Sequence, residues 1–177
     1  MNEILIEKKN LRKVLIEKRN FLKKNSIEEF SLNVFNQLTK SIDFDTIKYV
    51  ASFISIQSEI STSHLNEKIL EMKKTLSFPV IKNNSQELIF KKFYSKKNFK
   101  VGKFNIPEPS KDSEEITPQL FFVPCLGFDS NGYRIGYGGG FYDKTFAKLK
   151  KLKFKFYTVG FAFDKQKQNK IPREKYD

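Results

Sequence analysis

The residues best suited to chemistry lie in one short stretch, residues 123–143, which reads Val-Pro-Cys-Leu-Gly-Phe-Asp-Ser-Asn-Gly-Tyr-Arg-Ile-Gly-Tyr-Gly-Gly-Gly-Phe-Tyr-Asp. Five of the eight glycines in the chain fall between positions 132 and 140. Because glycine has no Cβ, successive backbone N–H groups can point into one concavity, and such a nest before a helix N-terminus binds phosphate. Arg134 adds a forked cation and Asp143 an oxygen ligand suited to Mg²⁺. The stretch therefore predicts a nucleotide site.

A purely structural interpretation of the same stretch stays open at this point. It would be a Gly-rich hairpin in which Asp143 is an ordinary acidic residue at a helix start and Tyr142 belongs to the core. The stretch is not a Walker A motif, because it lacks the Gly-Lys-Ser/Thr ending, and no dinucleotide-binding unit opens the chain. The neighbouring Arg134 and Asp143 favour the nucleotide site.

Two basic residues near the N-terminus share one face of a predicted helix. Lys8 and Arg12 are four positions apart, and like charges at that spacing repel by roughly 0.2–0.5 kcal/mol. A bound triphosphate would reverse that cost. A Lys-rich chain also produces such pairs by chance, so the spacing alone does not assign them a role.

The elements that must position these residues alternate between helix and strand. Periodic apolar residues predict helices over 3–24, 27–40, 61–74 and 141–151. Strands are predicted over 47–56, 76–81, 88–94, 120–123 and 154–163, with mostly loop over 96–117 and a polar tail over 164–177. This order predicts an α/β fold, a single-domain three-layer sandwich whose open, mostly parallel sheet has helices on both faces. Ligands of such sheets bind at the carboxyl ends of strands, where the loops after Ile56 and Val123 lie.

Composition limits the class of protein. A chain of 177 residues suits one domain with a single core. Its 33 Lys and Arg against 20 Asp and Glu give a net charge of +13, which attracts anions or reflects a Lys-rich solvated surface. The single cysteine, Cys125, cannot form an intramolecular disulfide, which fits a reducing cytosol. No segment approaches the ~18 apolar residues of a membrane span, so we expect a soluble, cytoplasmic protein without a membrane partner.

The stretch from Pro124 to Asp143 resembles the 5-formyltetrahydrofolate cyclo-ligase (methenyltetrahydrofolate synthetase) family, whose pattern is roughly P-G-L-A-F-D-x-x-G-x-R-x-G-x-G-x-G-x-Y-D. The matching positions are Pro124, Leu126, Phe128, Asp129, Gly132, Arg134, Gly136, Gly138, Gly140, Tyr142 and Asp143. Cys125 and Gly127 depart from the family's usual Gly and Ala, and neither change removes a ligand. Further similar segments, in the family's order, are Lys8 with Arg12, 58–62, Phe78-Pro79, 107–109 and 159–172.

The resemblance implies that residues 1–177 form one cyclo-ligase domain that closes 5-formyltetrahydrofolate into 5,10-methenyltetrahydrofolate, with ATP as co-substrate and Mg²⁺ as cofactor. The implied ATP-binding residues are Lys8, Arg12, Arg134, Ile135, Gly136, Tyr137, Gly138, Gly139, Gly140, Phe141 and Tyr142, of which Lys8, Arg12 and Arg134 would be catalytic. The implied folate-binding residues are Ile54, Glu59, Tyr137, Gly138, Gly139, Gly140 and Tyr142. Asp143 and Asp177 would hold the metal. The family continues past the position of Asp177 with another short strand, which we expect this chain to lack.

Three other interpretations are weighed against the cyclo-ligase. The net charge and many aromatic residues would suit a nucleic-acid-binding protein, but the basic residues are spread along the chain and no nucleic-acid module is visible. A different ATP- or sugar-phosphate-using α/β enzyme could share the Gly-rich loop. A relative that only binds folate is disfavoured by the intact Lys8, Arg134 and Asp143. We expect a monomer that binds no nucleic acid, and Lys96-Lys97 could attract a polyglutamyl tail of the substrate.

Overall fold

A six-stranded sheet forms the centre of the molecule in the computed structural model, which describes residues 3–25, 38, 41–82 and 85–173. The strand order is β10-β7-β1-β2-β3-β6. The strands are β1 (Tyr49–Ala51), β2 (Thr75–Ile81), β3 (Leu88–Lys92), β6 (Glu115–Ile116), β7 (Leu120–Pro124) and β10 (Tyr157–Phe161). Strands β10, β7, β1 and β2 are parallel, whereas β3 runs antiparallel to both β2 and β6. The expected open and mostly parallel sheet is confirmed.

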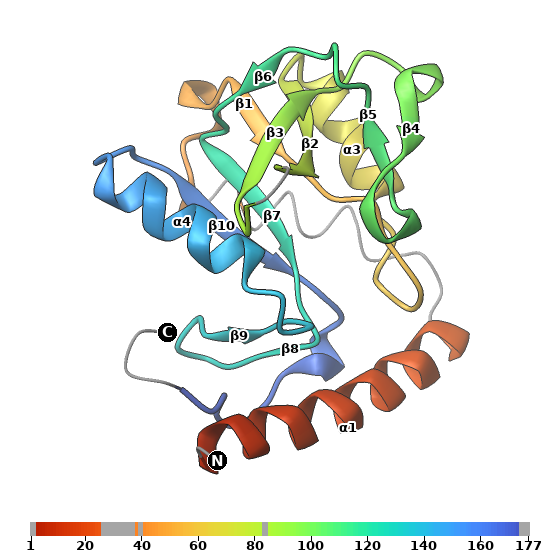
Figure 1. Ribbon diagram of the computed structural model, residues 1–177, viewed down its shortest axis with the longest axis vertical. Helices are drawn as coiled ribbons and strands as arrows, with labels where there is room; N and C mark the ends of the chain where they lie inside the picture. The colour runs from red at the N-terminus through yellow and green to blue at the C-terminus, as the bar shows by residue number, and fades with distance from the viewer. Residues whose placement is uncertain (1–2, 26–37, 39–40, 83–84, 174–177) are drawn as a thin grey trace.

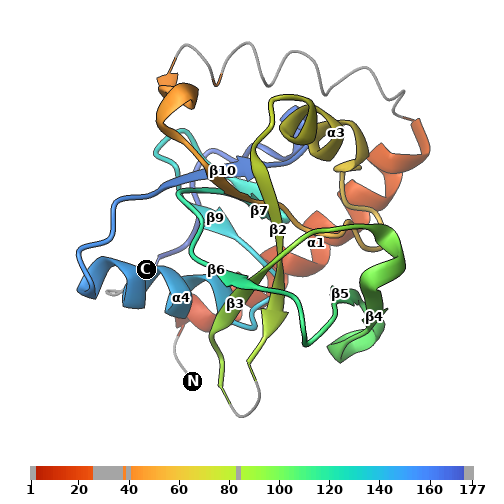
Figure 2. The ribbon, with the colours of Figure 1, turned by 90° about the horizontal axis from the view of Figure 1, so that it is seen from above.

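Helices cover both faces of this sheet, as the sequence predicts. Helix α3 (Ser63–Glu71) and helix α4 (Phe141–Lys151) lie on opposite sides of it (Figure 2). Central strand β7 explains why both faces need cover, because its first four side chains are all buried. Leu120 and Phe122 join the core beneath α3, and Phe121 and Val123 join the core beneath α4. A strand buried on both faces reads as a continuous apolar run rather than an alternating one.

Helix α1 (Glu3–Asn25) lies away from the sheet and packs on a small hairpin (Figure 1). The hairpin consists of β8 (Gly127–Phe128) and β9 (Arg134–Ile135), which pair antiparallel directly after β7. Leu15 of α1 packs with Leu126, Ile135 and Ile171 in a third apolar cluster. The Gly-rich segment is therefore a structured hairpin clamped by the N-terminal helix, followed by a short loop into α4.

The region expected to be mostly loop, residues 96–117, contains short elements of its own. They are η2 (Lys96–Asn98), β4 (Phe99–Val101), η3 (Lys103–Asn105) and β5 (Pro107–Pro109), followed by β6. Strands β4 and β5 form a two-stranded ribbon. The sequence did not predict this ribbon, because Pro107 and Pro109 suggest a loop. Proline is nevertheless tolerated in an edge strand. A further short turn, η1 (Phe44–Thr46), precedes β1, and η4 (Asp164–Gln166) lies in the expected polar tail.

Three predicted strands are longer than the observed ones, and β1 departs most. It ends at Ala51 instead of residue 56: the Ser52 N–H still donates to the Ser77 carbonyl of β2, and the chain then enters a loop that is held by hydroxyl groups. The Thr62 hydroxyl donates to the Phe53 carbonyl at 2.8 Å, and the Ser55 hydroxyl donates to the Ile60 carbonyl at 2.7 Å. Ile54 accordingly lies in a loop and not in a strand. The strands predicted over 88–94 and 154–163 span residues 88–92 and 157–161.

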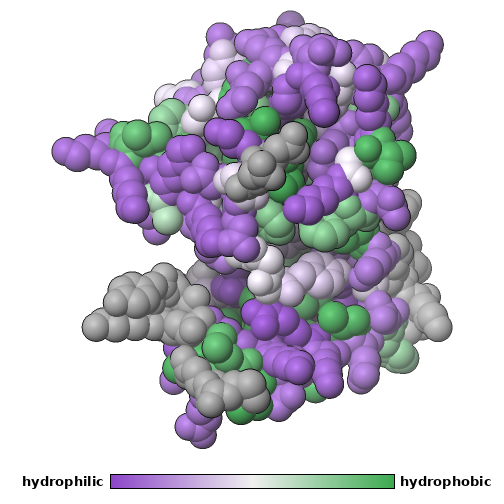
Figure 3. Space-filling view, viewed as in Figure 1, coloured by the Kyte–Doolittle hydropathy of each residue, from purple (hydrophilic) through white to green (hydrophobic). Residues whose placement is uncertain are grey.

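The surface is dominated by hydrophilic side chains, which cover most of the face shown in Figure 3. This agrees with the 33 Lys and Arg in the sequence. Within the described ranges, no helix has the length and apolar character needed to cross a membrane. The helix predicted over 27–40 falls outside the described residues except for Leu38, and so does Asp177.

Candidate active site

The loop between the hairpin and α4 has the backbone geometry expected of a phosphate cradle. Gly138 and Gly140 have positive φ angles of 97° and 68°, a region that L-residues with a side chain rarely adopt. Gly140 occupies the N-cap position of α4 without any side-chain cap. The first N–H groups of a helix have no partner within it, and they favour an anion. The end of α4 thus faces this loop with donors that no capping side chain occupies.

Arg12 holds the loop from the α1 side. Its Nε donates to the carbonyl oxygen of Gly136 at 2.9 Å. A Cβ added to Gly138 would lie 3.2 Å from the Arg12 guanidinium carbon, which is closer than ordinary van der Waals contact. Glycine at position 138 therefore serves both the backbone conformation and the close approach of Arg12.

Lys8 shares the inward face of α1 with Arg12, as predicted from their spacing. Lys8 is buried, and Arg12 is partly buried. Leu15 and Leu22 of the same helix are also buried, so this face alternates cationic and apolar side chains. Positions that recur every three to four residues fall on one side of a helix. A single amphipathic face thus supplies the packing surface and the two cations.

Arg134 and Asp143, predicted to bind phosphate and metal, form an ion pair with each other. The Arg134 Nη2 donates to the Asp143 Oδ1 at 2.7 Å, and 72% of the Asp143 side chain is exposed. An ion pair this open to solvent contributes little to stability, on the order of 0–1 kcal/mol. Both groups can therefore be redirected to a ligand at small cost.

Tyr142 packs under the loop on the α4 side. Its ring lies 5.7 Å from that of Phe146, and the Arg134 guanidinium carbon lies 5.7 Å from its centroid. Burial raises the pKa of the Tyr142 phenol well above its usual range, although nearby Arg134 acts in the opposite direction. Ile135 is buried against α1, and Phe141 packs on the α4-face core. These three side chains support the loop, and none of them lines the cavity described next.

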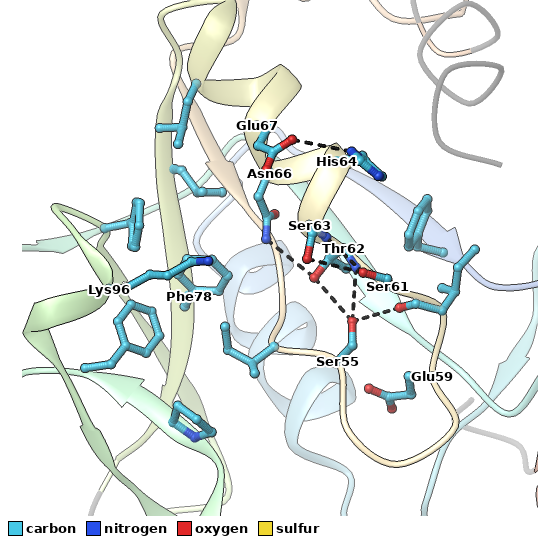
Figure 4. Close-up of a pocket in the computed structure, with 18 of the residues that line it drawn as sticks. Ser55, Glu59, Ser61, Thr62, Ser63, His64, Asn66, Glu67, Phe78 and Lys96 are labelled. Atoms are coloured by element: carbon cyan, nitrogen blue, oxygen red, sulfur yellow. Dashed lines mark hydrogen bonds and ion pairs between the residues drawn. The ribbon is translucent and has the colours of Figure 1, made fainter. Parts of the chain in front are cut away.

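A cavity of about 810 Å³ lies between α3, β2 and the β4–β5 ribbon. Glu59 and Lys96 line it (Figure 4), and so does Ile54, so it brings together two of the residues predicted to bind folate. Its apolar wall includes Phe78, Phe93 and Phe99, whose rings meet edge to face with centroids 5.4–5.8 Å apart. Its volume is that of a pocket for a small organic ligand.

Polar groups gather at the N-terminal end of α3, on one side of this cavity. Ser55, Thr62 and Asn66 are linked by hydrogen bonds of 3.3–3.4 Å and all line the cavity (Figure 4). The Oδ1 of Asn66 is buried and has no hydrogen-bond partner among the described residues. A cavity with apolar walls and a few convergent polar groups can both hold and orient a ring system.

Glu59 is buried where the cavity approaches α1. Its Oε2 accepts from the backbone N–H of Ile56 at 3.0 Å, and its Oε1 lies 3.6 Å from the Nη1 of Arg19. The side chains of Glu59 and Arg19 are 4% and 1% exposed. A buried carboxylate needs such partners, because an isolated charge in the interior is costly. The geometry fixes the Glu59 carboxylate at the edge of the cavity.

Arg19 is a residue that the sequence analysis missed. It contacts both regions of the site, because its Nε donates to the Ser58 hydroxyl at 3.1 Å and its Nη2 donates to the hydroxyl of Tyr137. The guanidinium also lies 5.3 Å from the centroid of the Tyr137 ring. Arg19 follows Arg12 by seven positions, two helical turns, and so continues the face of Lys8 and Arg12. This seven-residue spacing is the feature of the sequence that could have identified Arg19.

Asp129 fastens the turn of the hairpin to the C-terminal part of the chain. Its Oδ1 accepts from the N–H groups of Asn131 and Tyr133 at 2.9 and 3.1 Å, and its Oδ2 accepts from Ile171 at 3.1 Å. Burial alone would raise the pKa of this carboxyl, but the three N–H donors and nearby Arg173 outweigh it, so the pKa is lowered. The ionised form of Asp129 is therefore part of the folded platform beneath the loop.

Cys125 has no nucleophilic role in this arrangement. Its thiol is buried, and burial raises its pKa to about 11. Because the thiolate is the reactive form, such a thiol is inert near neutral pH. The prediction of a small buried residue is confirmed.

Comparison with known proteins adds to this geometry. The sequence model described as the 5-formyltetrahydrofolate cyclo-ligase family matches residues 5–177. A 5-formyltetrahydrofolate cyclo-ligase from Escherichia coli is 32% identical over 133 residues, 72% of each chain. The Mycoplasma genitalium protein of that name is 30% identical over 169 residues, 92% of this chain and 88% of its own. The solved structure of Aquifex aeolicus 5,10-methenyltetrahydrofolate synthetase superposes with a TM-score of 0.75 at 31% identity, covering 96% of this chain and 84% of that one.

Proposed function

Because the chain belongs to the 5-formyltetrahydrofolate cyclo-ligase family, we propose that the Gly-rich loop and the cavity beside Glu59 are the ATP and folate sites of that activity. The reaction closes 5-formyltetrahydrofolate into 5,10-methenyltetrahydrofolate and consumes ATP. One observation carries the assignment: Arg19 contacts Tyr137 in the loop and Glu59 in the wall of the cavity. The two sites are therefore neighbours, as phosphoryl transfer between their ligands requires.

Phosphoryl transfer is the first step of the proposed mechanism. The formyl oxygen at N5 attacks the γ-phosphorus, and the bond from that phosphorus to the ADP oxygen breaks. Arg12, Arg134 and Lys8 would neutralise the negative charge on the transferring group, while the amides of residues 138–141 hold its oxygens. Fixed cations and N–H dipoles aimed at developing charge supply the largest part of many enzymatic rate enhancements.

Ring closure follows at the activated carbon. N10 attacks the carbon that carries the phosphorylated oxygen, the N10 proton is lost, and the carbon–oxygen bond breaks to release phosphate. The cavity favours this step by holding the folate ring system against Ile54 and the phenylalanine wall. The buried Glu59 carboxylate is placed to accept hydrogen bonds from N–H groups of the substrate, which would fix N5 and N10 relative to the loop.

Magnesium fits this site as an ion bound with ATP. Among the described residues, no group of three or more His, Cys, Asp or Glu side chains is arranged to hold a metal. Mg²⁺ commonly takes only one or two protein carboxylates and completes its shell with phosphate oxygens and water. Asp143, exposed in the first turn of α4, is a suitable carboxylate. When bound, the ion would neutralise phosphate charge, and Asp177 stays a second predicted ligand.

Several finer properties belong to the same proposal. We propose that residues 1–177 act as one domain and as a monomer, in the cytoplasm. Lys96 at the rim of the cavity would favour a substrate with additional glutamate carboxylates. Equal affinity for mono- and polyglutamylated substrate would contradict the role of Lys96. The family membership favours this enzymatic interpretation over nucleic-acid binding.

The decisive experiment follows the absorbance band of the methenyl product. Purified protein is mixed with 5-formyltetrahydrofolate, ATP and Mg²⁺, with controls that lack ATP or Mg²⁺. Growth of the band that depends on both additions would establish the activity and the metal requirement. Folate binding without product would identify an inactive relative, and the absence of both would overturn the proposal.

A further inference from the structure

A polar junction centred on Arg19 joins the two parts of the site. The Tyr137 hydroxyl accepts from the Nη2 of Arg19 and donates to the Gln57 Oε1 at 3.2 Å. On its other side, Arg19 contacts Ser58 and Glu59. The loop that carries the phosphate cradle is thereby tied, through one tyrosine and one arginine, to the turn that carries the wall of the cavity.

The contacts of the Arg19 guanidinium suit a role at this junction better than a role in core packing. The whole residue is 1% exposed, yet its Nη1 makes no hydrogen bond within the described part of the chain and has only the 3.6 Å ion pair with Glu59. Burying a guanidinium costs free energy when one of its N–H donors has no acceptor within hydrogen-bond distance, unless a rearrangement brings an acceptor to it. A small shift of Glu59 toward Arg19 would convert the ion pair into a hydrogen bond.

The turn on the cavity side is also poised to shift. Gln57, at the tip of the turn, has a φ of 50°, an uncommon conformation for a residue with a Cβ. The turn is closed by the Glu59 N–H, which donates to the Ile56 carbonyl at 2.9 Å, and by the Glu59 carboxylate on the Ile56 N–H. Its unfavourable backbone is thus held by side-chain contacts, two of which lead to Tyr137 and Arg19. Such conformations persist only where surrounding contacts enforce them.

The loop side of the junction lies within the cradle itself. Tyr137 stands between Gly136, whose carbonyl accepts from Arg12, and Gly138, where an added Cβ would lie 3.2 Å from the Arg12 guanidinium carbon. Phosphates that draw Arg12 or the loop amides toward them must move Tyr137. That movement changes the contacts of Arg19 and Gln57, and hence the placement of Glu59.

We propose that Arg19 and Tyr137 couple the two substrate sites, so that ATP binding shifts the Glu59 turn and each substrate strengthens the binding of the other. This inference rests on the proposed function, because it takes the loop and the cavity as the two substrate sites. Arg19 acts in it as a positioning residue that need not touch either substrate. By thermodynamic linkage the effect is reciprocal: folate tightens ATP by the same factor by which ATP tightens folate.

The test measures this factor by calorimetry. The affinity of a non-hydrolysable ATP analogue with Mg²⁺ is determined with and without saturating 5-formyltetrahydrofolate, for the unmodified protein and for Tyr137→Phe. This variant keeps the ring over Arg19 and removes only the hydroxyl that links Arg19 to Gln57. We expect coupling of about fivefold or more in the unmodified protein, the lower end of typical values. In the variant the coupling should fall to within twofold.

Two further variants separate coupling from folding. Arg19→Lys keeps the buried charge opposite Glu59 but lacks the fork that reaches Ser58 and Tyr137 together, so it should also lose the coupling. Combining it with Tyr137→Phe should add no further loss. Tyr157→Phe, an exposed tyrosine of β10, is the matched control and should keep the full coupling. Thermal unfolding of each variant reports damage to the fold.

The outcomes distinguish this inference from the proposed function. Coupling below twofold in the unmodified protein, or unchanged coupling in Tyr137→Phe, would overturn it even if product forms normally. A Tyr137→Phe protein that loses affinity for each ligand separately, with coupling intact, would show a direct contact instead and also overturn it. Failure of the unmodified protein to form product or bind folate would remove the proposed function and this inference together.

Discussion

The two halves of the proposed active site are built in opposite ways. The phosphate cradle consists of backbone and exposed charge: positive-φ glycines, an uncapped helix end and the Arg134–Asp143 pair. The cavity proposed for folate is walled by buried and partly buried rings from β2, β4 and the segment between β3 and β4, with a few hydroxyl and amide groups. Binding an anion requires a fixed backbone and charged side chains that can turn toward it, whereas binding a flat ring system requires a cavity of matching shape. The same chain meets these needs with different residue types.

This difference decides what each mutation should change. A change in the cradle should affect the transition state or ATP, because charge develops there. A change in the cavity should affect folate affinity, because apolar contacts bind ground state and transition state alike. A cradle mutation that changes only folate affinity, or a cavity mutation that changes only ATP affinity, would contradict this distinction.

The largest effect is expected from Arg134→Ala. This variant removes the guanidinium beside the helix end, and the loss of one key charge-stabilising group lowers kcat by ~10²-fold or more. The measurement is the initial rate of methenyl product formation at saturating substrates. Lys150→Ala, an exposed cation farther along α4, should keep its rate. A near-normal rate for Arg134→Ala would remove Arg134 from the mechanism.

A smaller effect confined to ATP is expected from Gly138→Ala. The positive φ costs a residue with a Cβ about 1–2 kcal/mol, and the new methyl would press on Arg12 at 3.2 Å. We expect the KM for ATP to rise by roughly 5–30-fold, with the KM for folate unchanged. Gly132→Ala is the matched control, because its φ of 80° imposes similar strain but no atom lies within 4 Å. An equal rise in the KM for ATP in Gly132→Ala would show that strain anywhere in the hairpin, and not the change in the loop beside Arg12, is responsible.

Ile54→Ala should produce the complementary and weaker effect. Loss of its apolar contact in the cavity amounts to about 1 kcal/mol, so the KM for 5-formyltetrahydrofolate should rise roughly fivefold. The KM for ATP and kcat should change little, because the contact is uniform along the reaction. Steady-state kinetics with each substrate varied in turn test this. A change in the KM for ATP alone would contradict the placement of folate in the cavity.

The smallest effect on catalysis, but a clear one on stability, is expected from Asp129→Asn. The folded-state pKa of Asp129 is lowered, so its ionised form stabilises the fold above the ordinary aspartate pKa of about 3.9. That stabilisation is lost as the pH falls through the folded-state value. Urea unfolding at pH 7 should show a lower midpoint for Asp129→Asn. The difference from the unmodified protein should shrink toward pH 3, and a constant difference would assign the effect to packing.

The sequence predicted the cradle far better than the cavity, for a physical reason. The cradle is local: Arg134, its glycines and Asp143 lie within ten consecutive residues, and the sequence indicates their chemistry directly. The cavity is assembled from residues between Ile54 and Phe163 whose types are those of any core. Ile54 and Glu59, which both line the cavity, were singled out only through the family resemblance. The extent of the cavity depended on the proline-containing β4–β5 ribbon, which the sequence assigned to loop.

The fold was predicted well where one interaction dominates, and less well where two compete. Apolar periodicity fixed α1 and α4 within a residue of their ends. Strand β1 ended early, and the loop that follows it is held by the hydroxyl groups of Ser55 and Thr62, a local arrangement that composition does not reveal. Arg19 was missed because a buried arginine looks like any other cation in a Lys-rich helix.

The clamp of α1 on the hairpin has a consequence for biosynthesis. Arg12 is held by Gly136, a partner 124 positions later in the chain, and Asp129 is held by Ile171. Chains emerge from the ribosome N-terminus first, so the face of α1 around Leu15 must wait for its partners Leu126, Ile135 and Ile171 until residue 171 has been made. Contacts of such long sequence separation also form slowly. The proposed phosphate cradle is therefore completed late, and a nascent chain holding only the first hundred residues has no assembled form of the proposed ATP site.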